Sequence, residues 1–222
     1  MVNRERIARK VAWDIKDGEF VNFGHGIPYS VAAFIDPRKK IFIHNEPGVI
    51  CTGPGSPPQK YDYDMLDSAN DFVSDLPGGA FMDTADSFAM IRGGHIGKTV
   101  LGALQVDENA DIANWAATGR PPAGIGGAMD LCAGCPEVLI AMESMTKNGM
   151  PKLLRKCTYP LTAAGKATKV YTEFGVMTVK PGEGFRLIEK FPDYSVDDIR
   201  KMVAVDFKTA EDLTEIDLGI PL

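Results

Sequence analysis

The chain has 222 residues, of which 45% are hydrophobic and 24% charged, and its mean hydropathy is −0.08. This length and composition predict an ordinary globular protein, and we expect residues 1–222 to form a single domain. The formal net charge of −6 argues against a nucleic-acid partner, because such a partner usually requires a basic face.

The apolar stretches are too short for a membrane span, and the N-terminus lacks the apolar block of a signal peptide. Four cysteines in a chain of this length do not indicate a disulfide framework. We therefore expect a cytoplasmic protein that does not bind a membrane.

Helices and strands are predicted to alternate along the first part of the chain. Ile7, Val11 and Ile15 recur at helical spacing, with Asn3 as a candidate cap and Gly18 as a stop. The next predicted elements are a strand over 20–23, a glycine-rich turn over 24–26, a helix over 29–35 and a buried strand over 41–44. Residues 47–63 are rich in proline and glycine and predict a long loop, which in compact domains is often functional.

The second part continues the alternation. A helix is predicted to end at 93–94, followed by strands over 99–104 and 137–142, with glycine-rich turns at 78–79 and 124–127. Stretches 169–179 and 185–189 predict a β-hairpin. Ser195 and Asp198 resemble a capping box that opens a helix over 196–203. The pattern predicts an α/β fold with an open, mostly parallel sheet flanked by helices, with a late β-hairpin at a mixed edge.

Glu46 follows the predicted strand 41–44, where ligand sites of open α/β sheets lie. By position alone, a carboxylate that merely faces solvent at a strand end is the better explanation, because glutamates are mostly exposed. The glycine-rich turns are weak signals, and neither the phosphate-binding loop motif nor the three-glycine dinucleotide fingerprint is complete.

Several ordered motifs together resemble a known family. They are residues 21–35 (VNFGHGIPYSVAAFI), 84–106 (TADSFAMIRGGHIGKTVLGALQV), 111–115 (DIANW), 124–131 (GIGGAMDL) and 156–162 (KCTYPLT). Over roughly residues 1 to 215 the chain resembles the β subunit of family I coenzyme A transferases of the 3-oxoacid type. The resemblance implies that family's fold, which is related to that of sugar-phosphate isomerases.

The resemblance implies that Glu46 is the catalytic nucleophile. The family's Ser-Glu-Asn-Gly motif falls on residues 45–48, so Asn45, Pro47, Gly48 and Gly53 are expected in the active-site loop. Asn45, Pro47 and Cys51 depart from the family pattern at Ser, Asn and Gly, which alters the walls around Glu46.

A glutamate suits this chemistry because it is ionised at neutral pH and needs no general base. Each tetrahedral step develops an oxyanion that requires fixed N–H donors. By resemblance, these are the backbone amides of Gly126, Gly127 and Ala128, with Asn114 as a side-chain donor. Gly24 and Gly26 are expected as further binding positions, and the loop 47–63 as a seal against water.

The resemblance also implies partners. Coenzyme A is expected as a substrate and not as a permanent cofactor, together with an acyl-CoA and a small carboxylic acid from short-chain acid or ketone-body metabolism. The chain lacks the Gly-Gly-Phe-Gly string of the family's α subunit, so we expect a hetero-dimer or an α2β2 assembly with that subunit.

Two further sequence signals are interpreted as features without a role in catalysis. Cys132 and Cys135 form a lone Cys-x-x-Cys pair, and no metal site is predicted because zinc usually takes four ligands. A basic cluster of Lys147, Lys152, Arg155 and Lys156 is interpreted as a solvated helix face, although it could meet the phosphates of coenzyme A.

Three other functions remain open at this stage. An acyl-CoA hydrolase on the same scaffold would release free thiol without an acceptor acid. A non-catalytic assembly subunit would tolerate substitution of Glu46. A sugar-phosphate isomerase of related fold would leave the matched motifs unexplained.

Overall fold

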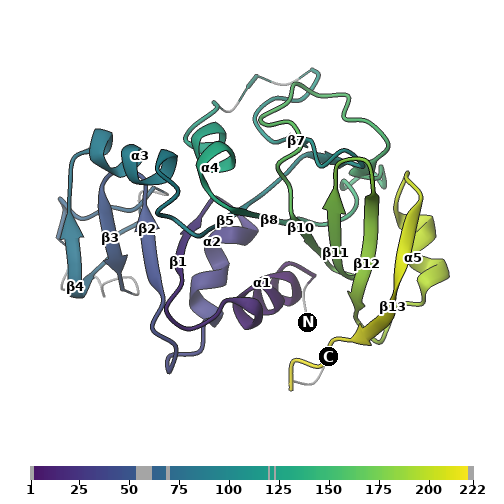
Figure 1. The fold of residues 1–222 in the computed structure, drawn as a ribbon, viewed down its shortest axis with the longest axis horizontal. Coiled ribbons are helices and arrows are strands. Elements are labelled where there is room, and N and C mark those ends of the chain that lie inside the picture. Colours follow the sequence, from purple (N-terminus) through teal and green to yellow (C-terminus); the bar gives the residue numbers. More distant parts are fainter. Residues whose placement is uncertain (1–2, 54–61, 69–70, 120, 123, 220–222) are drawn as a thin grey trace.

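The computed structural model describes residues 3–53, 62–68, 71–119, 121–122 and 124–219. Ten strands form its main sheet: β1 (Phe20–Phe23), β2 (Phe42–Asn45), β3 (Val49–Thr52), β4 (Asp75–Phe81), β5 (Lys98–Leu101), β8 (Glu137–Ala141), β10 (Lys169–Thr172), β11 (Gly175–Lys180), β12 (Gly184–Lys190) and β13 (Phe207–Glu215). Figure 1 shows this sheet crossing the whole described structure, from β4 at one edge to β13 at the other.

The strand order is β13-β12-β11-β10-β8-β5-β1-β2-β3-β4. The five central strands, from β10 to β2, run parallel to their neighbours, and antiparallel pairs extend the sheet on both sides. The fold class predicted from the sequence is confirmed, including the late hairpin, which is formed by β11 and β12.

Helices cover both faces of the sheet. They are α1 (Asn3–Asp14), α2 (Ile27–Val31, continued by a 3-10 turn over Ala32–Phe34), α3 (Thr84–Arg92), α4 (Ala128–Gly134) and α5 (Val196–Met202). Successive strand residues point to opposite faces, so Val100 joins one core with Ile7 of α1, while Leu101 joins the other with Ile91 of α3 and Leu131 of α4. Burial of these alternating residues is what fixes the register of the central strands.

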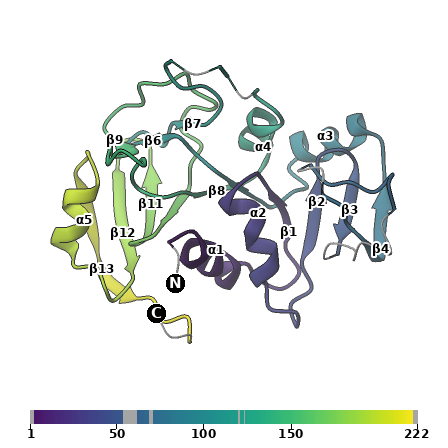
Figure 2. The ribbon, with the colours of Figure 1, turned by 180° about the vertical axis from the view of Figure 1, so that it is seen from behind.

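A small second sheet lies beyond the main one. It consists of β6 (Gln105–Asp107), β7 (Ile112–Ala113) and β9 (Leu153–Leu154), in the order β7-β6-β9. Figure 2 shows it above the ends of β8 and β11. Val106, Ile112 and Leu153 bury their side chains in the same core as α3 and α4.

The prediction of an unbroken loop over 47–63 is wrong in its first part. Residues 49–52 form β3, which pairs antiparallel with β2 and β4, and residues 54–61 lie outside the described residues. The strand predicted over 169–179 is also wrong as one element, because it divides into β10 and β11. The glycine pair 78–79 lies within β4 and not in a turn.

The other predicted elements are found with small shifts at their ends. Ser195 caps α5 and forms the predicted capping box with Asp198, whereas Asn3 is the first residue of α1. The predicted helix 29–35 begins two residues earlier, because Pro28 fits the first turn of a helix. None of the helices in the described part of the chain could cross a membrane.

Candidate active site

Glu46 lies at the tip of the hairpin formed by β2 and β3. It follows Asn45, the last residue of β2, and the turn is closed by the Gly48 amide, which donates to the Asn45 carbonyl at 3.0 Å. Since β2 belongs to the parallel block, Glu46 projects at the carboxyl edge of the sheet, as the sequence predicts.

The start of α3 anchors this turn. The Met82 amide donates to the Gly48 carbonyl at 2.9 Å, and the Thr84 hydroxyl donates to the Pro47 carbonyl at 3.1 Å. Gly48 has a φ of 125°, and a side-chain Cβ at this position would lie 2.0 Å from the Met82 carbonyl oxygen. Only glycine therefore allows the turn to pack this closely against α3.

A cavity of about 640 Å³ opens beside Glu46. Its walls come from segments that follow the central strands: residues 24–27 after β1, 101–104 around the end of β5 and 141–143 at the end of β8. The helix after β1 covers one face of the sheet and the helix after β5 covers the other. The cavity thus occupies the switch point between β1 and β5, where α/β sheets bind their ligands.

Opposing effects act on the Glu46 carboxyl group. Burial raises its pKa, because the ionised form loses hydration, while the Asn22 side-chain amide, the Gly127 backbone N–H and His25 favour the ionised form. Asp130 is a further group that raises this pKa. The Glu46 side chain is half-buried, and the hydrogen-bond donors around it favour its ionised form.

The backbone at Gly127 lies close to the Glu46 carboxylate. A Cβ at Gly127 would lie 2.2 Å from Glu46 Oε2 and 3.2 Å from the Phe88 ring. The residue directly precedes α4, and hydrogen bonding from its N–H lowers the pKa of Glu46. An N–H at this place could also stabilise an oxyanion formed on a group attached to Glu46.

Most of the predicted site residues line this one cavity. They are Glu46, Gly24, Gly26, Asn114, Gly126, Gly127 and Ala128. The side chain of Asn114 is already engaged, since its Nδ2 donates to the Gly102 carbonyl at 3.3 Å and its Oδ1 accepts from Thr162 at 2.5 Å. Asn114 therefore has only one remaining N–H to offer a ligand.

The structure does not place the other four predicted residues in the cavity wall. Asn45 is buried and donates to Thr52 at 2.9 Å across the hairpin, and Pro47 is exposed. Gly48 shapes the turn, and the Gly53 amide donates to the Ser74 carbonyl at 2.7 Å. These positions support the hairpin that carries Glu46 and do not contact the cavity directly.

Sequence reasoning missed Asn22 and His25. Asn22 pairs with His44 across β1 and β2, and its amide donates to the His44 carbonyl at 3.2 Å. The Nε2 atom of His44 lies 2.9 Å from the hydroxyl oxygen of Ser87 in α3. Burial lowers the pKa of His44 to about 4. A polar residue inside the apolar strand 20–23 was the available signal, since buried polar groups need partners.

Comparisons with known proteins agree with this geometry. Residues 4–202 match the family model described as Coenzyme A transferase. The chain is 41% identical over 206 residues to one of the subunits of 3-oxoadipate CoA-transferase from Pseudomonas putida, covering 92% of this chain and 95% of the relative. It is 40% identical over 210 residues to the β subunit of acetate CoA-transferase from Escherichia coli strain K12, covering 95% of both. The chain belongs to the coenzyme A transferase family.

Solved structures support the family's fold. An acyl-CoA transferase of Escherichia coli O157:H7 superposes with a TM-score of 0.77 at 20% identity, covering 97% of this chain and 43% of that one. The family resemblance and the transferase class of enzyme predicted from the sequence are confirmed.

The basic cluster of this coenzyme A transferase chain is not a helix face. Lys147 and Lys156 are exposed, and Arg155 pairs with Asp206 at 2.8 Å. Lys152 alone among the four lines the cavity that holds Glu46. Sequence periodicity could not separate these residues, because the segment is a loop that leads into β9.

Cys132 and Cys135 are buried free thiols. Burial raises the pKa of Cys132 and of Cys135 to about 12, which makes both poor thiolate ligands at neutral pH. Within the described residues, no group of three or more His, Cys, Asp or Glu side chains is placed to hold a metal ion. The absence of a metal from this coenzyme A transferase stays a prediction.

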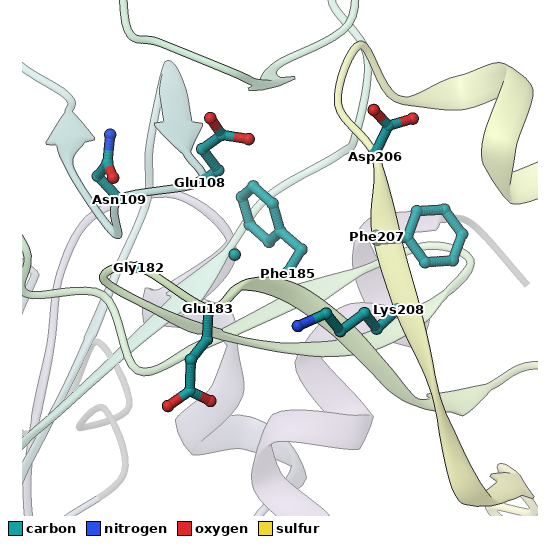
Figure 3. A pocket seen from close by; sticks show the side chains of 9 residues that line it. Glu108, Asn109, Gly182, Glu183, Phe185, Asp206, Phe207 and Lys208 are labelled. Carbon is teal, nitrogen blue, oxygen red and sulfur yellow. The ribbon is translucent and has the colours of Figure 1, made fainter.

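A second cavity, of about 380 Å³, lies far along the sheet from Glu46. Figure 3 shows Glu108 and Asn109 on one side of it and Asp206, Phe207 and Lys208 of the β13 region on the other. Asp206 is already paired with Arg155. None of the predicted site residues is among its described walls, so we assign no role in coenzyme A transfer to this cavity.

Proposed function

We propose that this chain transfers coenzyme A between an acyl-CoA thioester, of the 3-oxoacyl or short-chain acyl type, and a small carboxylic acid. Glu46 is the nucleophile. The observation that carries the proposal is the half-buried Glu46 carboxylate, held by Asn22 and Gly127 in a cavity at the switch point of the sheet. The names of the relatives, which are CoA-transferase subunits, support the same activity.

The reaction proceeds in balanced steps. The Glu46 carboxylate attacks the thioester carbonyl, which forms an acyl–glutamyl anhydride and releases coenzyme A as a thiolate. The thiolate then attacks the glutamyl carbonyl, which gives a glutamyl–CoA thioester and frees the first carboxylic acid. The acceptor acid reverses both steps, so that no water and no general base are consumed.

The neighbours of Glu46 have defined roles in this scheme. The Gly127 N–H stabilises the oxyanion of each tetrahedral intermediate, and the loss of one such donor typically slows a reaction about 100- to 1,000-fold. Asn22 orients the carboxylate. Gly24, Gly26, Gly126, Ala128 and Asn114 shape the cavity, and the hairpin residues Asn45, Pro47, Gly48 and Gly53 hold the nucleophile in place.

The working enzyme contains a second subunit in this proposal. Both bacterial relatives are named as one subunit of a CoA-transferase, and each is covered over nearly its whole length. We propose that this chain forms a single domain, acts in the cytoplasm and assembles with an α subunit that supplies much of the coenzyme binding. Coenzyme A is a substrate and no cofactor is bound permanently.

The test uses the chain co-purified with its α subunit. With acetoacetyl-CoA or a short-chain acyl-CoA as donor, we expect formation of a new acyl-CoA that depends on an added carboxylic acid, and no exchange by this chain alone. Free thiol released without an acceptor would instead identify a hydrolase. Unchanged turnover by a Glu46→Gln complex would identify a non-catalytic subunit.

A further inference from the structure

Lys152 occupies a fixed place in the wall of the cavity that holds Glu46. Its amide donates to the Ser144 carbonyl at 2.8 Å, and its carbonyl accepts from the Val106 amide at 3.0 Å. With both backbone groups bonded and β9 beginning at the next residue, the side chain starts from a rigid position.

The strand order places Lys152 and Glu46 at opposite ends of the cavity. Glu46 follows β2, whereas Lys152 is bonded to Ser144, three residues beyond the end of β8. Three strand spacings separate β2 from β8 in the order β8-β5-β1-β2, which corresponds to about 14 Å. Glu46 and Lys152 both line the cavity that spans this distance.

The Lys152 ammonium group has no ion-pair partner among the described residues. The nearby carboxylates are already engaged: Glu143 accepts from Arg4 at 3.1 Å, and Glu173 accepts from the Ser144 amide at 2.8 Å and its hydroxyl at 2.6 Å. Burial lowers the pKa of Lys152, as is expected for a cation that has lost hydration without gaining a direct partner.

We propose that Lys152 is a specificity-determining residue that binds the second carboxylate of a dicarboxylic substrate, while Glu46 reacts at the other end of the same molecule. This inference rests on the proposed function and adds a substrate class to it. A substrate carboxylate would give the ammonium group the charge-assisted hydrogen bond that the protein does not supply.

The phosphates of coenzyme A are a less suitable occupant of this position. They lie at the far end of the pantetheine arm, which is longer than a short dicarboxylic acid, and they carry several negative charges. Lys152 is one ammonium group in the loop before β9, with the Glu143 and Glu173 carboxylates close by and the Arg4 guanidinium near it but paired with Glu143. Such a position suits a single carboxylate better than a pyrophosphate.

The test compares acceptor acids in the assembled complex. With one acyl-CoA donor, kcat/KM is measured for succinate and glutarate and for the monocarboxylates butyrate and pentanoate. For Lys152→Met we expect a loss of about 10- to 100-fold for the dicarboxylates, chiefly in KM, and a change within about twofold for the monocarboxylates. Lys156→Met, at an exposed position outside the cavity, should leave all four values unchanged.

Other results would overturn the inference in distinguishable ways. An equal loss for both classes of acid would show that Lys152 is structural, and a raised KM for the acyl-CoA donor with every acceptor would assign it to the phosphates. If the unmodified complex transferred coenzyme A to monocarboxylates alone, the dicarboxylic substrate class would be wrong, while the proposed transferase activity would still hold. If it transferred coenzyme A to none of the acids, the proposed function itself would be wrong.

Discussion

The reactivity of Glu46 depends on a balance between burial and hydrogen bonding. Burial raises its pKa and removes water from the carboxylate, while Asn22 and Gly127 hold the ionised form. A carboxylate that is partly stripped of water and fixed in direction is a better nucleophile than a fully hydrated one. The two donors therefore preserve the charge that burial would otherwise remove.

Gly127→Ala tests the close approach of the backbone to Glu46. The added Cβ would lie 2.2 Å from Glu46 Oε2, and the Gly127 backbone (φ −82°) accepts an alanine. The carboxylate must therefore move, and we expect kcat of the assembled complex to fall about 100-fold or more. Gly97→Ala is the control, because its Cβ would meet only ordinary contacts. Equal rates in both variants would contradict the proposed role of Gly127.

His44 makes the stability of the protein depend on pH. Its folded pKa of about 4 lies below the ordinary value of 6.5, so the unfolded chain binds the proton more tightly. Stability is complete above about pH 6.5, falls as the pH decreases towards 4, and the total loss from this group is about 3 kcal/mol. Urea denaturation at several pH values measures this slope.

The matched variants for this prediction are His44→Gln and His95→Gln. The first removes the buried imidazole and should flatten the fall in stability between pH 6.5 and 4, whatever its effect at pH 7. The second changes an exposed histidine and should leave the slope as it is. If the His44 variant keeps the full slope, another group is responsible.

At the scale of elements, the hairpin formed by β2 and β3 positions the nucleophile. Its turn is held between the Asn45 carbonyl and the Met82 backbone, and it has no room for a side chain at Gly48. The shape of this turn, more than the identity of Asn45 or Pro47, places Glu46 at the cavity.

Gly48→Ala should destabilise the fold by about 3 kcal/mol and also reduce activity. The Cβ would lie 2.0 Å from a backbone oxygen that cannot move without displacing α3, and φ would remain at 125°. Gly149→Ala separates the two effects, because Gly149 also has a positive φ but no atom within 4 Å of the added Cβ. Comparable urea midpoints for the two variants would show that the clash is relieved.

The sequence predicted the buried elements well and the edges of the sheet poorly. The strand over 20–23 was found as predicted, because both of its faces are buried and its residues are largely apolar. The two edge strands were missed: β4 contains Pro77 and two glycines, and β13 mixes charged and polar residues with few apolar ones. Edge strands tolerate such residues, so local composition does not reveal them.

At the scale of the whole molecule, the site depends on contacts that no local pattern contains. Glu46, Gly24, Gly127 and Asn114 come from four distant segments, and their common cavity was predicted by resemblance to a family. The roles of Asn22 and Lys152 required the structure, because they follow from the strand order β8-β5-β1-β2. The sequence alone could not supply that order.

The most direct test of the central claim is mass spectrometry of the assembled complex after incubation with acyl-CoA in the absence of an acceptor acid. We predict that the peptide containing residue 46 gains the mass of coenzyme A through a thioester, that borohydride removes the adduct by reduction, and that Glu46→Gln abolishes both adduct and exchange. A thioester on any other residue, or normal exchange by the Glu46→Gln complex, would contradict the assignment of Glu46 as the nucleophile.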